Sequence, residues 1–375
     1  MKKILLIHTK YQNIGGEDIA VDNEIDLLEK EYEIKSLILE NSFKTFFLNL
    51  IGLNNNQKKI NNLIEQHNPS IVYFQNTWFS IPSSYIRLLS KRNLDVRIKL
   101  HNFRYICCSS YLLKNHVSNM ESCGACGIEN KKYKFFNKYF EESYLKSIYS
   151  IYFHKKFFSL IKDANLKIYV LTNFHRNFLI NKGINEEKIS VLRNYLPEVK
   201  FGSVIKDDDY ILYAGRISKE KGIIELLESF NKSNVQNLGL KIIGSGPLLD
   251  YVKKIYSSEK IKFYGALDNK EVLNYIKNAK AVVTATKMYE GQPNLLCESS
   301  LLGKVSIFPN AGGIKEFFPQ DSSFMYDQFQ YDQLVEKIIS LKDNGNLDAE
   351  GIKNKKFANE ILSIDKLIRK FKESK

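Results

Sequence analysis

The sequence predicts an α/β protein of two domains, each built around a parallel β-sheet. Short apolar runs typical of buried strands recur along the whole chain, and helical patterns separate them. Strands that alternate with helices favour a parallel sheet with right-handed crossovers. The length of 375 residues exceeds what one hydrophobic core usually organises, so we expect two domains.

The composition is that of a globular protein, with 44% hydrophobic and 26% charged residues. The apolar run at residues 4–7 is far too short to cross a bilayer and does not resemble a signal peptide, so we expect a cytoplasmic protein. Residues 1–200 carry 29 Lys and Arg against 19 Asp and Glu, whereas the remainder carries 26 against 23. A basic first half suits nucleic acid, anionic lipid or a phosphorylated substrate. Because no zinc-finger or RNP motif is present, we expect no nucleic-acid partner.

The first element is a strand at residues 3–8, which leads into Gly15-Gly16 and then a helical pattern. A strand, a glycine loop and a helix begin a nucleotide-binding βαβ unit, because glycine lets backbone N–H groups approach a phosphate at the helix N-terminus. The full GxGxxG pattern is absent, so an ordinary tight turn is the alternative.

The alternation continues through the first domain. Further strands are expected at residues 33–39, 70–74, 96–100, 167–171 and 188–192, and helices at 57–67 and 82–91. Asn76 and His101 follow two of these strands directly. The carboxyl ends of parallel strands share one edge of a sheet, where ligands bind, so we expect both side chains at that edge.

Residues 102–165 interrupt the alternation and form an expected insert in the first domain. Its cysteines are Cys107, Cys108, Cys123 and Cys126, and the last two have CxxC spacing. A structural zinc site would also need Cys107 or Cys108 with His101 or His116, since a second CxxC is missing. Reduced thiols in a folded loop are the alternative.

Residues 131–158 mix Lys with Tyr and Phe. Basic and aromatic side chains on helices suit a membrane surface that carries anionic lipid. Amphipathic helices packed on the domain, with lysines that reach past the apolar surface to water, explain the same pattern.

A polar stretch at residues 198–209 is the expected linker between a first domain at 1–200 and a second at 206–349. Strands are expected at residues 210–214, 240–243, 262–264, 281–284 and 305–308, and helices at 220–230 and 269–278. A last helix at about 350–372, within a segment 350–375, is expected to cross back to the first domain.

The most informative stretch is residues 289–316, which holds Glu290 and Glu298 with seven residues between them. Pro293 suits the start of a helix, which puts Glu290 on a loop and Glu298 about one turn inside the helix. Ionised carboxylates at the ligand edge can accept several sugar hydroxyls. For Glu298 alone, a helix N-terminal Glu that complements the helix dipole is the alternative.

Arg216 and Lys221 follow the strand at 210–214, near the start of a helix. A planar fork donor and a point charge beside a helix N-terminus can together hold a diphosphate. Either residue alone would be interpreted as a solvated surface cation.

These motifs together resemble the family 4 glycosyltransferases of GT-B architecture. The resemblance rests on Gly215-Arg216 to Lys221-Gly222, Glu290 and Glu298, Gly312-Gly313 before Glu316, and Gly15-Gly16. Residues 101–107 and the later CxxC resemble a subgroup found in bacterial surface-polysaccharide assembly. The family implies two Rossmann-like domains whose parallel sheets face each other across a cleft that holds a nucleotide-sugar.

The resemblance also implies an activity: a hexosyltransferase that acts with retention of anomeric configuration. The donor would be a UDP- or GDP-sugar, and the acceptor a glycan or lipid-linked glycan in capsule, O-antigen or exopolysaccharide biosynthesis. A UDP-sugar epimerase of GT-B fold, or a catalytically silent nucleotide-sugar-binding subunit, is the alternative, because fold alone does not decide function.

Each motif residue acquires a role through the resemblance. Arg216 and Lys221 would hold the donor diphosphate, Glu298 the ribose, and Glu290 the transferred sugar. Gly16, with Gly15 beside it, would offer a backbone N–H to the β-phosphate, and His101 would contact the sugar. The donor-binding set is completed by Asn294 and Leu295. Gln292 and Tyr195 depart from the family pattern, which has an aromatic residue and Gly there.

We expect no metal or other cofactor, because fixed cations and helix N-termini can stabilise the charge on a leaving diphosphate. Other sugar transferases bind a metal through a DxD motif, which Asp207-Asp208-Asp209 superficially fits. That run precedes the strand at 210–214 and so lies at its amino end, away from the ligand edge. We interpret it as part of the solvated linker.

Overall fold

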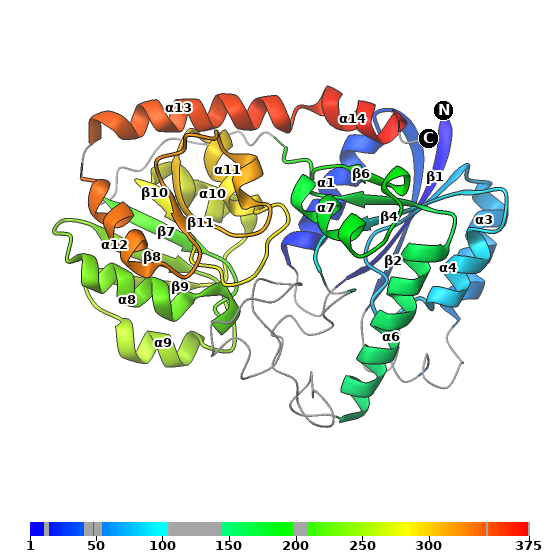
Figure 1. Cartoon of the computed structure of the whole chain (residues 1–375), viewed down its shortest axis with the longest axis horizontal. Coiled ribbons are helices and arrows are strands. Elements are labelled where there is room, and N and C mark those ends of the chain that lie inside the picture. The colour runs from blue at the N-terminus through cyan, green and yellow to red at the C-terminus, as the bar shows by residue number, and fades with distance from the viewer. Residues whose placement is uncertain are drawn as a thin grey trace. The chain divides into compact units, whose positions relative to one another are not determined.

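The computed structural model describes residues 1–10, 15–40, 48, 55–103, 105, 144–197, 209–342 and 344–373. They form two six-stranded sheets, both parallel and both flanked by helices, which confirms the predicted α/β class (Figure 1). Contacts divide the chain into two compact units. The first unit takes in the described residues of Met1–Ser110, Tyr133–Leu196 and Leu362–Lys375, and the second those of Pro197–Ile361.

The first unit has the strand order β2-β1-β3-β4-β5-β6. Its strands are β1 (Lys2–Lys10), β2 (Tyr32–Glu40), β3 (Ile71–Phe74), β4 (Asp95–Leu100), β5 (Lys167–Val170) and β6 (Ile189–Val191). Ile4, Leu5, Leu6 and Ile7 are fully buried on β1, because helices cover both faces of a parallel sheet. The predicted strands are therefore present, with ends shifted by a few residues.

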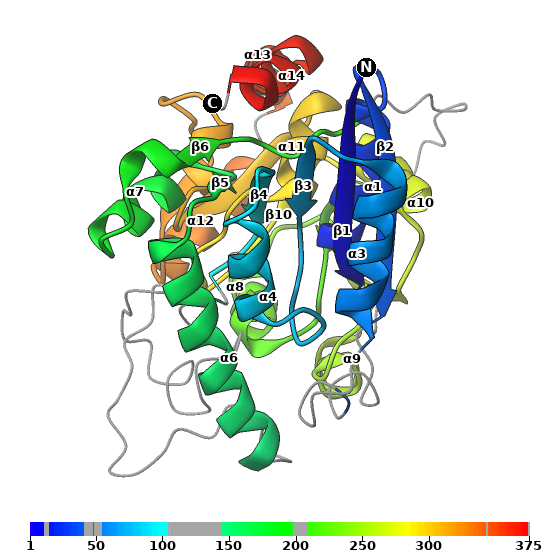
Figure 2. The same ribbon diagram turned by 90° about the vertical axis from the view of Figure 1, so that its right-hand side faces the viewer.

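Helices of the first unit connect these strands. They are α1 (Gly16–Leu28), α3 (Asn56–His67), α4 (Ser83–Leu89), α6 (Tyr144–Asp163), α7 (Asn173–Asn181) and the 3₁₀ turn η1 (Glu186–Lys188). Figure 2 shows α4 and α6 side by side, in agreement with their contacts. The chain leaves β1 toward β2 through α1 and then returns across the sheet, so right-handed crossovers place α1 on the opposite face from α3 and α4.

The second unit has the strand order β12-β11-β10-β7-β8-β9. Its strands are β7 (Tyr210–Ala214), β8 (Gly239–Ile243), β9 (Ile261–Gly265), β10 (Ala281–Val283), β11 (Val305–Asn310) and β12 (Met325–Asp327). The helices are η2 (Lys219–Lys221), α8 (Ile223–Ser233), α9 (Leu249–Tyr256), α10 (Asn269–Asn278), α11 (Asn294–Leu301), η3 (Ile314–Phe317), α12 (Tyr331–Ser340) and α13 (Asn344–Ile361). Figure 1 shows α8 and α9 on one side of this sheet, and α11 and α13 on the other.

The pattern did not predict several short elements of the structure, among them α7, α9 and β12. The N-cap of α7 is Thr172, whose hydroxyl accepts a hydrogen bond from the backbone N–H of His175 at 3.1 Å. Such short segments have too few apolar positions to show a period, so tertiary packing decides their structure.

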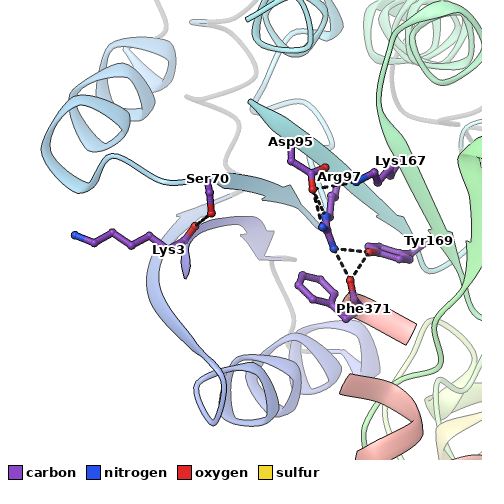
Figure 3. Close-up of polar contacts among 7 residues, drawn as sticks. All are labelled: Lys3, Ser70, Asp95, Arg97, Lys167, Tyr169 and Phe371. Carbon is purple, nitrogen blue, oxygen red and sulfur yellow. Dashed lines mark hydrogen bonds and ion pairs between the residues drawn. The ribbon is translucent and has the colours of Figure 1, made fainter. Parts of the chain in front are cut away.

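The expected last helix is in fact two helices, α13 and α14 (Ile364–Glu373). α14 buries Leu367 and Phe371 in the core of the first unit. Figure 3 shows how Arg97 on β4 holds its end: Nη1 donates to the Phe371 carbonyl and to the Tyr169 hydroxyl, each at 2.7 Å. Nη2 of the same guanidinium donates to Asp95 at 2.6 Å. A buried fork donor therefore binds one of the helix carbonyls that lack an intrahelical partner.

Candidate functional site

In the second unit, the loop after β7 packs against the loop after β10. Gly222 adopts φ +67°, and a Cβ there would lie 1.9 Å from the carbonyl oxygen of Ala285. Only glycine permits this close approach of two backbones. The contact holds η2 beside residues 285–290, and Lys221 is the last residue of η2. Gly222 thus brings the segment that carries Lys221 next to the segment that carries Glu290.

Lys221 and Glu290 meet at this contact. The ammonium Nζ of Lys221 donates to Oε1 of Glu290 at 2.5 Å. The hydroxyl of Thr286 donates to the same oxygen at 3.0 Å. The two charged side chains keep 29% and 20% of their surface exposed, so a ligand can reach both. Thr286 was not identified from the sequence, because a lone Thr in a loop carries no signal.

The backbone of Glu290 is held by the double-glycine turn. Glu290 forms a parallel bridge with Gly312, and the N–H of Gly313 donates to the Glu290 carbonyl at 3.0 Å. Gly312 adopts φ +58°, and a Cβ there would lie 2.8 Å from both the nitrogen and the oxygen of Glu290. Gly312 and Gly313 therefore fix the backbone of Glu290, because glycine permits this close approach.

The charge of Lys221 is secured by its neighbours. Burial alone lowers the pKa of Lys221, but the bonded carboxylate of Glu290 and the nearby Glu220 outweigh burial, and the pKa is raised. The positive charge of Arg216 lowers the pKa of Lys221, which places the guanidinium near the ammonium. The Arg216 side chain is exposed, and its carbonyl accepts from the Tyr213 hydroxyl at 2.7 Å. Two cations, Lys221 and Arg216, thus gather with the carboxylates of Glu290 and Glu220 at the carboxyl edge of β7 and β10.

Glu298 lies one turn inside α11 and is separate from the Lys221–Glu290 pair in its contacts. Pro293 is the N-cap of α11, and Asn294 and Leu295 are its first two residues, both half-buried. The Nδ2 of Asn269 donates to Oε1 of Glu298 at 3.5 Å. Burial raises the pKa of Glu298 to about 7, so this carboxyl titrates near neutrality. Such a shift is frequent at functional sites.

In the first unit, His101 follows β4 and meets Gln75, which follows β3. The ring Nε2 of His101 lies 2.7 Å from Oε1 of Gln75. Burial, helped by the positive charge of Lys99, holds the pKa of His101 well below its usual value, so the ring is neutral. Nε2 then donates its proton to Gln75, and Nδ1 is left as an acceptor. Gln75 was not singled out from the sequence.

Gly15 and Gly16 open α1. Gly15 is the N-cap and Gly16 the first helical residue. The N–H of Gly15 donates to Oδ2 of Asp18 at 2.9 Å, and Oδ1 of Asp18 contacts Nε2 of the buried His8 at 2.9 Å. Asp18 thus ties the glycine loop to β1. The spacing of an acid three residues after the N-cap was the signal that could have identified Asp18.

Several predicted features lie outside the described residues: Cys107, Cys108, Cys123, Cys126, His116, Asp207, Asp208 and the basic aromatic run at 131–143. Asp209 is described, at the amino end of β7, where it pairs with Lys280 at 3.4 Å. Among the described residues, no three or more His, Cys, Asp or Glu side chains are grouped as a metal site. Within the same ranges, no helix has the length and apolar character needed to cross a membrane.

Residues 197–357 match the family described as "Glycosyl transferases group 1". The capsular polysaccharide biosynthesis glycosyltransferase CapH of Staphylococcus aureus is 22% identical over 359 residues, which is 91% of this chain and 92% of CapH. The lipopolysaccharide 1,2-N-acetylglucosaminetransferase of Salmonella typhimurium is 27% identical over 128 residues, or 31% of this chain. That alignment spans only 34% of the Salmonella protein.

A solved structure resembles the whole fold. The crystal structure of HepE from Anabaena in complex with UDP and glucose has a TM-score of 0.71 to this chain at 13% identity. It covers 100% of this chain and 99% of its own. The fold is therefore of GT-B type, and residues 197–357 of the second unit are similar to glycosyl transferases group 1.

Proposed function

We propose that this glycosyltransferase transfers a sugar, with retention of configuration, from a UDP- or GDP-sugar to a glycan or lipid-linked glycan acceptor. The observation that carries the proposal is the meeting of Lys221 and Glu290 at 2.5 Å on the carboxyl edge of the second sheet. A cation for the diphosphate and a carboxylate for the sugar hydroxyls are there within reach of one ligand. The similarity to CapH supports capsular or related surface polysaccharide as the product.

The proposed donor contacts follow from the chemistry of each side chain. Arg216 and Lys221 hold the diphosphate, and Glu298 accepts hydroxyls of the ribose near the start of α11. Asn294 and Leu295, at the first turn of that helix, line the nucleotide side. Glu290 accepts hydroxyls of the transferred sugar. Each carboxylate therefore binds a different part of the donor. In the second unit the two are already held by different side chains, Glu290 by Lys221 and Glu298 by Asn269.

The first unit contributes the glycine loop and His101 in this proposal. The loop of Gly15 and Gly16, tied to β1 through Asp18, supports the β-phosphate near the N-terminus of α1. His101 is neutral, so it contacts the sugar by hydrogen bonds and does not serve as a charge.

The proposed chemistry uses these residues directly. Breaking the anomeric C–O bond moves negative charge onto the diphosphate, where the Lys221 ammonium and the Arg216 guanidinium stabilise it more than in the ground state. The raised pKa of Lys221 keeps its proton in place throughout. We propose that the reaction needs no metal.

A donor panel tests the proposed function. Purified full-length chain is incubated with UDP- and GDP-sugars, with and without glycan acceptors, and products are identified by NMR. We expect turnover with at least one donor, retention at the anomeric carbon, and loss of turnover in Glu290→Ala. Wild type and Glu290→Ala that behave alike would overturn the assignment. A new sugar without acceptor would indicate an epimerase, and nucleotide binding without any turnover would indicate a silent binding subunit.

We also propose that the protein works in the cytoplasm and binds the anionic inner face of the plasma membrane through α6. Tyr144, Leu145, Ile148 and Tyr152 are between 55% and 71% exposed on this helix, and Lys155 and Lys156 beside them are exposed as well. Apolar and basic side chains on one helix suit anionic lipid. Co-sedimentation with anionic vesicles that weakens with salt is expected, and no binding at low salt would refute this part.

A further inference from the structure

The loop at residues 284–290 connects β10 to Glu290 and is fixed at both of its ends. At the first end, the backbone N–H of Thr284 donates to the Ile307 carbonyl at 3.0 Å, and the Tyr326 hydroxyl donates to the Thr284 carbonyl at 3.0 Å. At the other end, the double-glycine turn holds the backbone of Glu290. The position of the middle of the loop therefore depends on contacts of its own.

Lys287 supplies contacts in the middle of this loop. Its backbone N–H donates to the carbonyl of Glu220 at 2.9 Å. Its ammonium forms an ion pair with the carboxylate of Glu225. Glu220 belongs to η2, which ends with Lys221, and Glu225 lies in the first turn of α8. Lys287 thus ties the loop after β10 to both elements that follow β7.

The ion pair of Lys287 and Glu225 is largely removed from water, since the two side chains are 7% and 16% exposed. Burial raises the pKa of Tyr331, and the negative charge of Glu225 raises it further. Burial also raises the pKa of Tyr326, with contributions from Tyr331 and Glu225. The carboxylate therefore lies near two aromatic residues, where a charge needs a fixed counter-ion. An ammonium that is buried and paired in this way serves the loop and is not presented to a phosphate.

Thr286 connects Lys287 to the site. Its hydroxyl donates to Oε1 of Glu290 at 3.0 Å, and the backbone N–H of Met288 lies 3.4 Å from the same hydroxyl oxygen. The N–H of Lys287 belongs to the planar peptide group that it shares with Thr286. A displacement of Lys287 therefore moves the hydroxyl that orients the Glu290 carboxylate.

We propose that Lys287 and Glu225 form a positioning pair for sugar transfer, which fixes the loop so that Thr286 orients the Glu290 carboxylate toward the transferred sugar. The proposal rests on the proposed function and deepens it, because it adds two positioning residues to the site. Neither was identified from the sequence, where a single Lys and a single Glu have the appearance of solvated surface charges.

Kinetics of variants of the pair test the proposal. We expect Lys287→Met and Glu225→Gln to lower kcat about tenfold, because a small misplacement of a positioned group is costly in the transition state. Affinity for UDP should stay within about twofold of wild type, since Arg216 and Lys221 are unchanged. Lys287→Arg, which keeps the cation, should recover most of the lost kcat. A wild-type kcat in Lys287→Met would overturn the proposal, and so would a loss of UDP affinity as large as the loss of kcat.

A double variant tests whether Lys287 acts through Thr286. If it does, Lys287→Met combined with Thr286→Val should lower kcat by less than the product of the two single losses, because both changes disturb the same hydrogen bond to Glu290. Losses that multiply would show that Lys287 acts independently of Thr286, which contradicts the proposed route.

Lys232→Met is the matched control on the same helix. Lys232 lies in the last turn of α8 and pairs with Asp332 at 2.7 Å, with side chains 65% and 83% exposed. Removal of this pair should leave kcat unchanged. Thermal melts report the folding of each variant, and Glu225→Gln, which keeps the side-chain shape, tests the pair if Lys287→Met does not fold. A control as slow as the variants of the pair would refute a specific role.

Hydrogen exchange tests the pair without turnover. The amides of Met288 and Gly313, which donate to Thr286 and Glu290, should exchange several-fold faster in Lys287→Met than in wild type or Lys232→Met. Unchanged exchange would overturn the proposal. Failure of the proposed function would appear differently, as a wild-type protein that transfers no sugar from any donor.

Discussion

Lys221 and Glu290 form an ion pair with Nζ and Oε1 2.5 Å apart, so the two residues proposed for the diphosphate and the sugar neutralise each other in the structure described here. A donor diphosphate must compete with the Glu290 carboxylate for the Lys221 ammonium. Part of the donor's binding energy is then used to separate the pair, which releases Glu290 toward the sugar hydroxyls.

Glu290→Gln should therefore bind UDP more tightly than wild type while it transfers sugar much more slowly. Removing one carboxylate frees the ammonium and removes a like charge near the phosphates, which we expect to raise UDP affinity about fivefold. Isothermal calorimetry measures the affinity of both proteins for UDP. The matched control is Lys221→Gln, which should lose UDP affinity. Equal affinity of Glu290→Gln and wild type would show that the pair does not compete.

Thr286→Val should lower kcat about tenfold and leave UDP affinity unchanged. Valine keeps the shape of threonine but loses the hydroxyl that donates to Glu290 at 3.0 Å, so the carboxylate is less precisely oriented. Steady-state kinetics with the active donor measure this. Thr284→Val is the control, because the hydrogen bonds that Thr284 makes among the described residues come from its backbone N–H and carbonyl. A comparable loss in the control would argue against a specific role of Thr286.

The carboxyl of Glu298 should make donor binding depend on pH. Burial raises the pKa of Glu298 to about 7, and the ionised form is the better acceptor for ribose hydroxyls. Affinity for a UDP-sugar, whose diphosphate does not titrate in this range, should fall as pH drops from roughly 8 to 6. Glu298→Gln should bind more weakly and lose this dependence. A wild-type affinity that is flat with pH would contradict the role.

The same pKa has a consequence for stability. A carboxyl whose pKa is raised on folding holds more protons in the folded state between its unfolded value, near 4.5, and about 7. The free energy of unfolding therefore falls as pH rises through that window. Glu298→Gln removes this term, so its Tm should exceed that of wild type at roughly pH 8 by more than at roughly pH 5. Thermal melts at the two pH values measure the difference, and an identical offset would argue against the shift.

Gly312→Ala should destabilise the second unit more than Gly265→Ala does, although both glycines have positive φ. A Cβ at Gly312 would lie 2.8 Å from backbone atoms of Glu290, whereas a Cβ at Gly265 meets nothing within 4 Å. Gly265→Ala should cost only the left-handed strain, about 1 kcal/mol. Gly312→Ala should cost more and displace Glu290, with loss of turnover. Denaturant unfolding and kinetics measure both, and equal costs would refute the clamp.

Arg97→Met should weaken the docking of α14 on the first unit. The variant leaves the Phe371 carbonyl, the Tyr169 hydroxyl and part of the Asp95 carboxylate without their donor, which we expect to cost about 2 to 4 kcal/mol (Figure 3). Hydrogen exchange of α14 amides and urea unfolding measure it. Lys372→Met, which removes an exposed pair with Glu31 at 2.8 Å, is the control and should have a small effect.

Much of the fold followed from periodicity, since the buried runs at residues 4–7, 71–74 and 210–214 are central strands that the pattern predicted. The spacing of apolar runs along the chain can be seen in a single sequence, so it predicts the strands without knowledge of the fold. Short segments such as α9 and β12 were missed because they carry too few positions to show a period.

The sequence alone also identified the residues suited to phosphate and sugar chemistry. They stand at strand ends and helix starts, where an α/β pattern places ligands: Arg216, Lys221, Glu290 and Glu298. Their partners were not readable. Thr286, Gln75 and Asp18 are ordinary polar residues, and their importance comes from what lies within hydrogen-bond distance.

Two relationships depended on the folded chain for a physical reason. Gly222 and Gly312 let separate segments of backbone approach closely. Lys221 and Glu290 therefore form an ion pair although they are 69 positions apart in the sequence. Burial then moved the pKa of Glu298 to about 7 and kept His101 neutral, effects that arise from removal of water and not from residue identity.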